Sequence, residues 1–186
     1  MNENQCRELV LTAVKDPKIS ALLHSLGKGK KDWDGIAIDC IKCSEEGVEG
    51  TARAMLSINP TQIILCANRL DSIKEISSSL THELVHAFDF IQNRYDFTSC
   101  YGLASSEIRA AREAECGDYT DSKLFPYFKN NCVSDHAKRS TKNMFPAEAN
   151  ECVETMFQKA MRDNEPFNEI ANSNSNSNIT ANMQTK

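Results

Sequence analysis

The sequence predicts an α+β fold in which a small sheet packs on one long central helix and further helices follow. The first observation is residues 72–93, where apolar side chains recur at helical spacing and no Gly or Pro interrupts them. The second is a series of β-rich segments before that helix: 35–40, 52–58 and 62–67. The third is two helical patterns after it: 104–116, which ends at a glycine, and 146–162, which begins at a proline.

Length and charge limit the possible classes of protein. The chain has 186 residues, enough for one domain with its own core. Its net charge of −5 and lack of a basic stripe argue against a nucleic-acid partner. No apolar run is long enough to span a bilayer. The N-terminus resembles neither a secretory signal nor an Arg-rich transit peptide.

The eight cysteines allow two interpretations. An even count favours disulfides and an oxidising compartment, and the mitochondrial intermembrane space reconciles this with the lack of a secretory signal. If the thiols are reduced, the C-x-x-C pair Cys40 and Cys43 can combine with Cys132 and His136 in a Cys₃His zinc site.

The segments before the central helix are short. Residues 7–15 are predicted helical, and Asp16 with Pro17 supplies an N-cap and first-turn proline for a second helix. His24 on that helix is expected to be a surface or partly buried residue. An edge strand of the predicted sheet, beside the central helix, can hold an extended peptide by backbone pairing, and the alternative is a purely structural strand.

The central helix carries the motif His82-Glu83-Leu84-Val85-His86. Ser72 and Glu75 have capping-box spacing, so the helix is expected to begin near residue 72. His82 and His86 lie one turn apart, so their imidazoles can reach one centre. Two neutral imidazoles suit a zinc ion, and the carboxylate of Glu83 suits a general base.

A catalytic zinc commonly takes a third protein ligand and leaves one position open. Glu107, in the next predicted helix, is the expected third ligand of a single Zn²⁺. Asp89 is the main alternative, although an orienting role suits it better. The remaining candidates are Glu113 and Glu115. Arg109 is expected to steady a substrate oxyanion or to pair with Glu113.

The rest of the chain completes one domain. Residues 118–145 are predicted to be irregular, with a short helix around 122–128. A last helix is expected from Pro146 to about Arg162. We predict a single zinc metalloprotease domain over 1–170 and a disordered Asn/Ser-rich tail over 171–186.

The longer metzincin motif needs Gly at position 89 and His at 92. Asp89 and Gln92 stand there, so that class is excluded. The remaining class of HExxH protease is a zincin-like domain whose third ligand is a Glu that follows the motif in the chain.

Four sequence blocks resemble the ATP-twenty-three type of mitochondrial inner-membrane metalloprotease, also called Ku-binding-like. The resemblance covers about residues 6–170, and two positions depart from the family pattern: Ser105 and Ala160 stand where cysteines are usual. The four blocks are Ile64-Leu65-Cys66-Ala67-Asn68-Arg69-Leu70, Thr81-His82-Glu83-Leu84-Val85-His86-Ala87-Phe88-Asp89, Leu103-Ala104-Ser105-Ser106-Glu107-Ile108-Arg109-Ala110-Ala111 and Asp163-Asn164-Glu165-Pro166-Phe167.

The resemblance implies a zinc metalloendopeptidase, peripheral to the mitochondrial inner membrane on the intermembrane-space side. It implies protein substrates, namely a membrane subunit of the ATP synthase that the family matures, and a separate part in ATP synthase assembly. It also implies His82 and His86 as ligands and Glu83 as the base. The alternative is a non-proteolytic assembly chaperone in which the zinc is structural.

Overall fold

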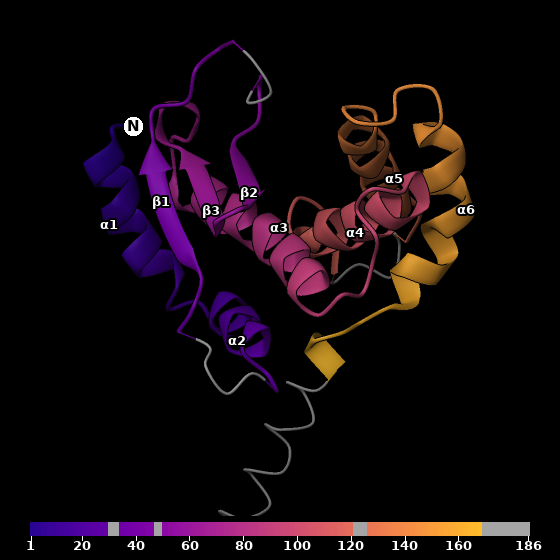
Figure 1. Ribbon diagram of the computed structural model, residues 1–186, viewed down its shortest axis with the longest axis horizontal. Coiled ribbons are helices and arrows are strands. Elements are labelled where there is room, and N and C mark those ends of the chain that lie inside the picture. Colours follow the sequence, from indigo (N-terminus) through magenta and orange to yellow (C-terminus); the bar gives the residue numbers. More distant parts are fainter. Residues whose placement is uncertain (30–33, 47–49, 121–125, 169–186) are drawn as a thin grey trace, which may run out of the picture.

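The computed structural model describes residues 1–29, 34–46, 50–120 and 126–168, and within them it confirms the α+β class. The long helix crosses the middle of the molecule, with the sheet and the first two helices on one side and the last three helices on the other (Figure 1). The elements are α1 (Glu3–Ala13), α2 (Pro17–Leu26), β1 (Ala37–Ile41), β2 (Ala54–Ile58), β3 (Thr61–Cys66), α3 (Ile73–Ile91), α4 (Cys100–Glu113), α5 (Pro126–Thr141) and α6 (Ala149–Arg162).

The first two helices begin at side-chain caps. Asn2 and Gln5 form a reciprocal capping box, so α1 begins earlier than the expected residue 7. Asp16 caps α2 by accepting from the amides of Lys18 and Ile19, as its place before Pro17 predicts.

The sheet has the order β1-β3-β2, with β1 parallel and β2 antiparallel to β3. The amide of Cys66 donates to the carbonyl of Arg53, which makes these two residues a hydrogen-bonded pair. Hydrogen-bonded and non-hydrogen-bonded pairs alternate along an antiparallel ladder. The backbone groups of Ala54 and Leu56 therefore point away from β3, toward the free edge of the sheet.

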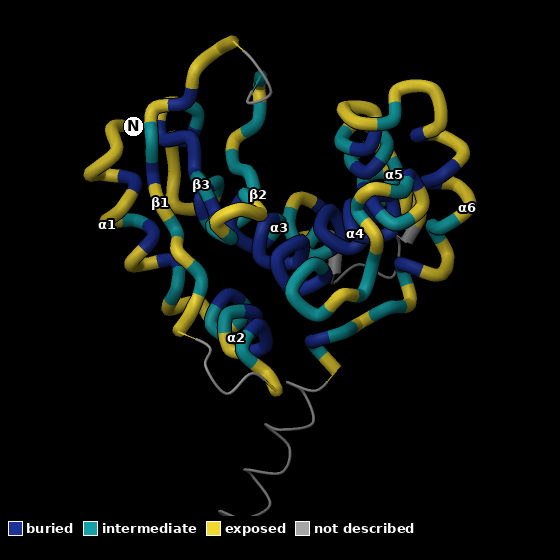
Figure 2. The backbone as a smooth tube through the Cα atoms, viewed as in Figure 1, coloured by how far each residue is buried: buried dark blue, intermediate teal, exposed yellow. Residues whose placement is uncertain are grey.

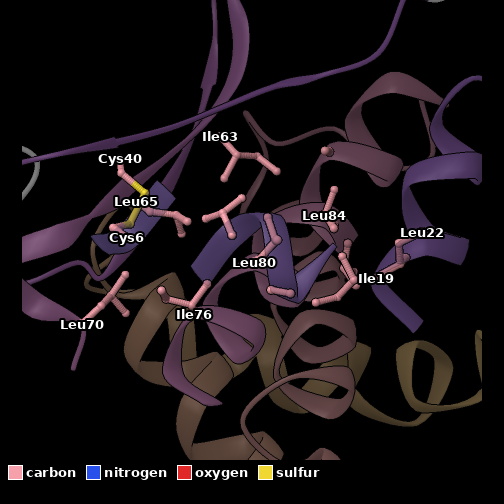
Figure 3. Packing of buried hydrophobic residues seen from close by; sticks show 14 of the residues in the cluster. Cys6, Ile19, Leu22, Cys40, Ile63, Leu65, Leu70, Ile76, Leu80 and Leu84 are labelled. Carbon is pink, nitrogen blue, oxygen red and sulfur yellow. A yellow bond between two sulfur atoms is a disulfide. The ribbon is translucent and has the colours of Figure 1, made fainter. Parts of the chain in front are cut away.

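Helix α3 begins as its sequence predicts, one residue after Ser72. The Ser72 hydroxyl accepts from the amide of Glu75 at 3.2 Å, whereas the Glu75 carboxylate accepts from the amide of Asp71 rather than that of Ser72. The apolar stripe of α3 packs between the sheet and α2 (Figure 3). The buried side chains at this contact are Ile76, Leu80 and Leu84 of α3, Ile63 and Leu65 of β3, and Ile19 and Leu22 of α2.

A second apolar cluster lies between α4, α5 and α6, and α4 also contributes Ala110 to the first cluster. Figure 2 shows that α3 and α4 form the buried centre of the molecule. Because α4 packs on α3 on one side and on α5 and α6 on the other, the side chains of α4 that face α3 are held rigidly.

Helix α5 contradicts the expectation of an irregular segment over 118–145. It spans Pro126–Thr141, and the expected short helix over 122–128 falls partly outside the described residues. Its buried apolar residues are few and small, chiefly Val133 and Ala137, so the sequence shows little helical periodicity. Packing on α4 and α6 stabilises α5 instead.

The cysteines form four disulfides, Cys6–Cys40, Cys43–Cys66, Cys100–Cys152 and Cys116–Cys132. The preference for disulfides is confirmed. The alternative Cys₃His zinc site is wrong, because Cys40 and Cys43 belong to separate disulfides and neither is paired with Cys132. The predicted Asn/Ser-rich tail lies outside the described residues.

Candidate metal centre and active site

Two imidazoles converge on the buried side of α3. His82 and His86 lie one helical turn apart, and their Nε2 atoms are 3.0 Å from each other. The side chains of His82 and His86 are only 14% and 11% exposed, respectively. Two imidazole nitrogens held this close in a largely buried place can both coordinate one metal ion.

Glu107 projects from α4 toward both imidazoles. Its Oε2 atom lies 3.4 Å from Nε2 of His82 and 3.6 Å from Nε2 of His86. This oxygen is buried and has no hydrogen-bond partner among the described residues. The three residues form a group with metal-ligand geometry, and the rival Asp89 is not part of it.

A divalent metal ion fits this arrangement. A buried carboxylate oxygen without a partner is costly unless an ion or a hydrogen bond satisfies it. Two imidazole nitrogens and one carboxylate oxygen form a donor set that suits a transition metal. The unpaired Oε2 atom of Glu107 is the structural observation that supports a metal at this place.

Charge couples the three side chains. Burial disfavours the carboxylate of Glu107, but the imidazoles of His86 and His82 outweigh burial and hold the pKa of Glu107 well below its ordinary value. Burial likewise disfavours the imidazolium of His82, but the carboxylates of Glu115 and Glu107 raise the pKa of His82 well above its ordinary value. The carboxylates of Glu107 and Glu115 therefore favour a positive charge between them, whether a proton on His82 or a bound cation.

Glu83 is buried beside this group and lines the adjoining cleft. Burial raises the pKa of Glu83 above its ordinary value, while the charges of His82 and His86 oppose that rise. A carboxylate whose pKa is raised toward neutrality takes up and releases a proton more readily at physiological pH.

The Nδ1 atom of each imidazole has its own oxygen partner. His82 Nδ1 lies 3.0 Å from Oε1 of Glu115, and His86 Nδ1 lies 2.8 Å from Oγ of Ser106. The Ser106 hydroxyl donates to Oδ2 of Asp89 at 2.8 Å, so it accepts from His86. Both Nδ1 atoms thus carry hydrogens, and both Nε2 lone pairs face Glu107.

Two of these partners were missed in the sequence. Glu115 was a candidate ligand there, but its carboxylate lies on the Nδ1 side of His82. For Ser106, the one signal in the sequence is its place directly before Glu107. The orienting role expected for Asp89 agrees with its hydrogen bond to Ser106.

Arg109 fills neither of its expected roles. Its guanidinium is 1% exposed and pairs with the fully buried carboxylate of Asp89. It also donates to the backbone carbonyl of Glu165. Glu113 pairs instead with Lys18 and Arg112. Arg109 therefore joins α4 to α3 behind the site and does not face a substrate.

A cleft of about 1020 Å³ opens beside His82. One wall is formed by residues 50–54, which lead into the edge strand β2, the other wall by α5, and the floor by α3. The lining comprises residues 50–54, Lys74, Glu75, Ser78, Ser79, His82, Glu83, Glu115, His136, Arg139, Ser140 and Asn143. Ala54, the first residue of β2, thus lines the same cleft as His82.

Within the described residues, two further clusters have ligand-type side chains, namely Cys116 with Cys132 and His136, and Cys100 with Glu148 and Cys152. In both clusters the cysteines are joined in a disulfide, which removes the thiolates that a metal requires. Among the helices that the structure describes, none has the length and apolar character to cross a membrane.

The chain resembles curated proteins named mitochondrial inner membrane protease ATP23 or its homolog. The Xenopus laevis relative is 32% identical over 139 residues, which are 69% of this chain and 58% of the relative. The human relative is 29% identical over 82% of this chain and 62% of its own length. The Schizosaccharomyces pombe relative is 28% identical over 84% of this chain and 86% of its own length.

The chain thus spans little more than half the length of some curated relatives. No solved structure matches it. The model of the Peptidase M76 family matches residues 4–168, which include the two histidines of α3 and the glutamate of α4. This match covers most of the sequence, and the chain therefore belongs to the Peptidase M76 family.

Proposed function

We propose that this chain is a zinc metalloendopeptidase with a zincin-like active site on α3. The observation that carries the proposal is the buried, unpaired Oε2 atom of Glu107, which faces the converging Nε2 atoms of His82 and His86. Membership of a peptidase family supports the same reaction class.

The three side chains His82, His86 and Glu107 would hold one Zn²⁺. Such an ion supplies Lewis acidity, which polarises a peptide carbonyl and lowers the pKa of water. Two imidazoles and one carboxylate, with a fourth position left open, are a standard donor set of catalytic zinc.

Glu83 is the proposed general base. Its carboxylate lines the cleft beside the two histidines, and its raised pKa suits proton transfer near neutral pH. It would take a proton from the attacking water and deliver it to the amine of the leaving peptide. Burial keeps bulk water from competing with this transfer.

The edge of β2 is the proposed binding place for the peptide. The outward N–H and C=O groups of Ala54 and Leu56 can pair with an extended segment, as an added strand does. Because Ala54 lines the cleft that also contains His82 and Glu83, a peptide paired there would pass over the proposed catalytic group.

The cellular setting is proposed from two sources. The relatives are named mitochondrial inner membrane proteases, and the four disulfides suit an oxidising compartment such as the intermembrane space. The resemblance of the sequence blocks supports peripheral association with the inner membrane and a membrane subunit of the ATP synthase as substrate. It also supports a part in ATP synthase assembly.

The test of this function is Glu83→Gln, with Glu75→Gln as the matched control because Glu75 lines the same cleft without contacting the histidines. Glu83→Gln is expected to keep its zinc and to lose cleavage of a peptide substrate by roughly 10²–10⁴-fold. Near-normal cleavage by zinc-loaded Glu83→Gln would overturn the proposal. If Glu83→Gln still supports ATP synthase assembly, the assembly role is separable from proteolysis.

A further inference from the structure

We propose that Glu115 is the positioning residue of His82, and that the Cys116–Cys132 disulfide holds Glu115 in place, so that metal affinity depends on this disulfide. The inference rests on the proposed metal site, and it adds a structural feature that determines how tightly that site binds its metal. It is carried by the contacts of Glu115 and by the way in which the chain is anchored on either side of it.

The contact between Glu115 and His82 fixes which imidazole nitrogen faces the metal site. Both carboxylate oxygens of Glu115 lie close to Nδ1 of His82, at 3.0 and 3.1 Å. A carboxylate can only accept, so Nδ1 donates and Nε2 keeps its lone pair. A carboxylate behind a ligand imidazole sets its orientation and raises its basicity.

The two histidines are positioned unequally. The partner of His86 is Ser106, which is fully buried in the middle of α4 and is itself bonded to Asp89. The partner of His82 lies beyond the end of α4, and its side chain is 29% exposed. Glu115 therefore lacks the support of a helix and needs another anchor.

That anchor is the residue after Glu115. The amide of Cys116 donates to the carbonyl of Ala111 at 2.9 Å, which returns the chain onto α4. The Cys116 side chain is fully buried, and its sulfur is bonded to Cys132 of α5. The turn that contains Glu115 is thus fixed between α4 and α5.

Loss of the disulfide would release this turn on its C-terminal side. Glu115 would then leave His82, because a partly exposed carboxylate gains little from one contact once its backbone is free to move. Loss of such a partner behind a ligand lowers metal affinity by about 10–100-fold.

The first experiment measures zinc affinity of the full chain by competition with a chromophoric chelator. Glu115→Ala is expected to bind zinc about 10–100-fold more weakly than wild type. Glu115→Gln should recover most of the affinity, since its amide oxygen can still accept from Nδ1. The visible spectrum of the Co²⁺-loaded proteins should change in Glu115→Ala and not in Glu115→Gln.

The matched control is Glu75→Ala, because the Glu75 side chain is 28% exposed, lines the same cleft and pairs with Arg53 instead of a histidine. It should leave zinc affinity at the wild-type value. Equal affinity of Glu115→Ala and wild type would overturn the positioning role. A wild-type protein that binds no zinc would overturn the proposed function as well, so the two failures are distinguishable.

The second experiment tests the disulfide. The double variant Cys116→Ser/Cys132→Ser should lose zinc affinity to the same degree as Glu115→Ala. The triple variant, which combines these two changes with Glu115→Ala, should lose little more. The control is Cys100→Ser/Cys152→Ser, which removes a disulfide from the other end of α4 and should keep wild-type affinity. Additive losses, or an equal loss in the control, would overturn the dependence on Cys116–Cys132. If the double variant does not fold, the Glu115→Ala arm still decides the positioning role.

Discussion

Arg109 of α4 and Asp89 of α3 form an ion pair that is almost completely removed from solvent, with side chains 1% and 0% exposed. The same carboxylate accepts from Ser106, the partner of His86. The ion pair thus connects the helix that supplies Glu107 to the helix that supplies both histidines. The relative position of the three proposed ligands depends on it.

Arg109→Met is expected to destabilise the protein strongly. It would leave the buried carboxylate of Asp89 with only Arg94, 3.5 Å away, as a cationic partner, and loss of one partner of a buried ion pair costs up to about 3–5 kcal/mol. Urea unfolding measures the loss, with Lys138→Met as a control because Lys138 pairs with Glu154 at the surface and should lose under about 1 kcal/mol. Similar losses in both variants would contradict the structural role of the buried pair.

Ser106→Ala is expected to weaken zinc binding by about 10–100-fold, because His86 would lose the acceptor that sets its orientation. The neighbouring Ser105 is the control. It is also fully buried, but its hydroxyl donates only within α4, to the carbonyl of Tyr101. Chelator competition should therefore show wild-type affinity for Ser105→Ala, and a loss in both variants would refute a specific role for Ser106.

The ion pairs of Glu113 are expected to make the free energy of unfolding depend on pH in the acidic range. Burial disfavours its charge, but Lys18 and Arg112 outweigh burial and lower the pKa of Glu113 below its ordinary value. A carboxyl whose folded pKa is lowered stabilises the protein fully above its unfolded pKa, which is about 4.5, and this stabilisation is lost as pH falls through the folded pKa.

The measurement is the free energy of unfolding against pH for wild type and Glu113→Gln. The advantage of wild type should be constant near neutrality and should shrink as pH falls below about 4.5. A difference that stays constant from neutral to strongly acidic pH would show that the contact of Glu113 with Lys18 does not depend on charge.

Ala54→Pro tests the edge of the sheet as the peptide-binding place. The amide of Ala54 points away from β3, so proline there removes no ladder hydrogen bond and the protein should still fold. Peptide affinity should fall by about 5–10-fold for one lost backbone hydrogen bond. Met55→Pro is the contrast, because the amide of Met55 faces β3 and loss of its hydrogen bond should destabilise the sheet. Unchanged peptide binding by Ala54→Pro would exclude pairing at this position.

The parts of the fold with strong local signals were predictable from the sequence. Ser72 and the uninterrupted apolar stripe gave the start and extent of α3, and Asp16 with Pro17 gave the start of α2. The convergence of His82 and His86 followed from helical spacing alone. Such features depend on neighbours in the chain, so they can be deduced without knowledge of tertiary contacts.

Features that depend on tertiary contacts were not predictable. Helix α5 has few large apolar residues and is stabilised by its packing on α4 and α6. Arg109 was expected near a substrate or Glu113, but burial and Asp89 determine its place. The role proposed for Glu115 depends on a turn beyond α4 and on a disulfide to α5, neither of which has a pattern in the sequence.

The most direct test of the central claim is the zinc content of the purified protein, measured by elemental analysis on wild type, Glu107→Ala and the control Glu75→Ala. We predict one zinc ion per chain in wild type and in Glu75→Ala, and a near-complete loss in Glu107→Ala. Full zinc content in Glu107→Ala, or a folded wild-type protein without affinity for zinc, would contradict a metal centre formed by His82, His86 and Glu107.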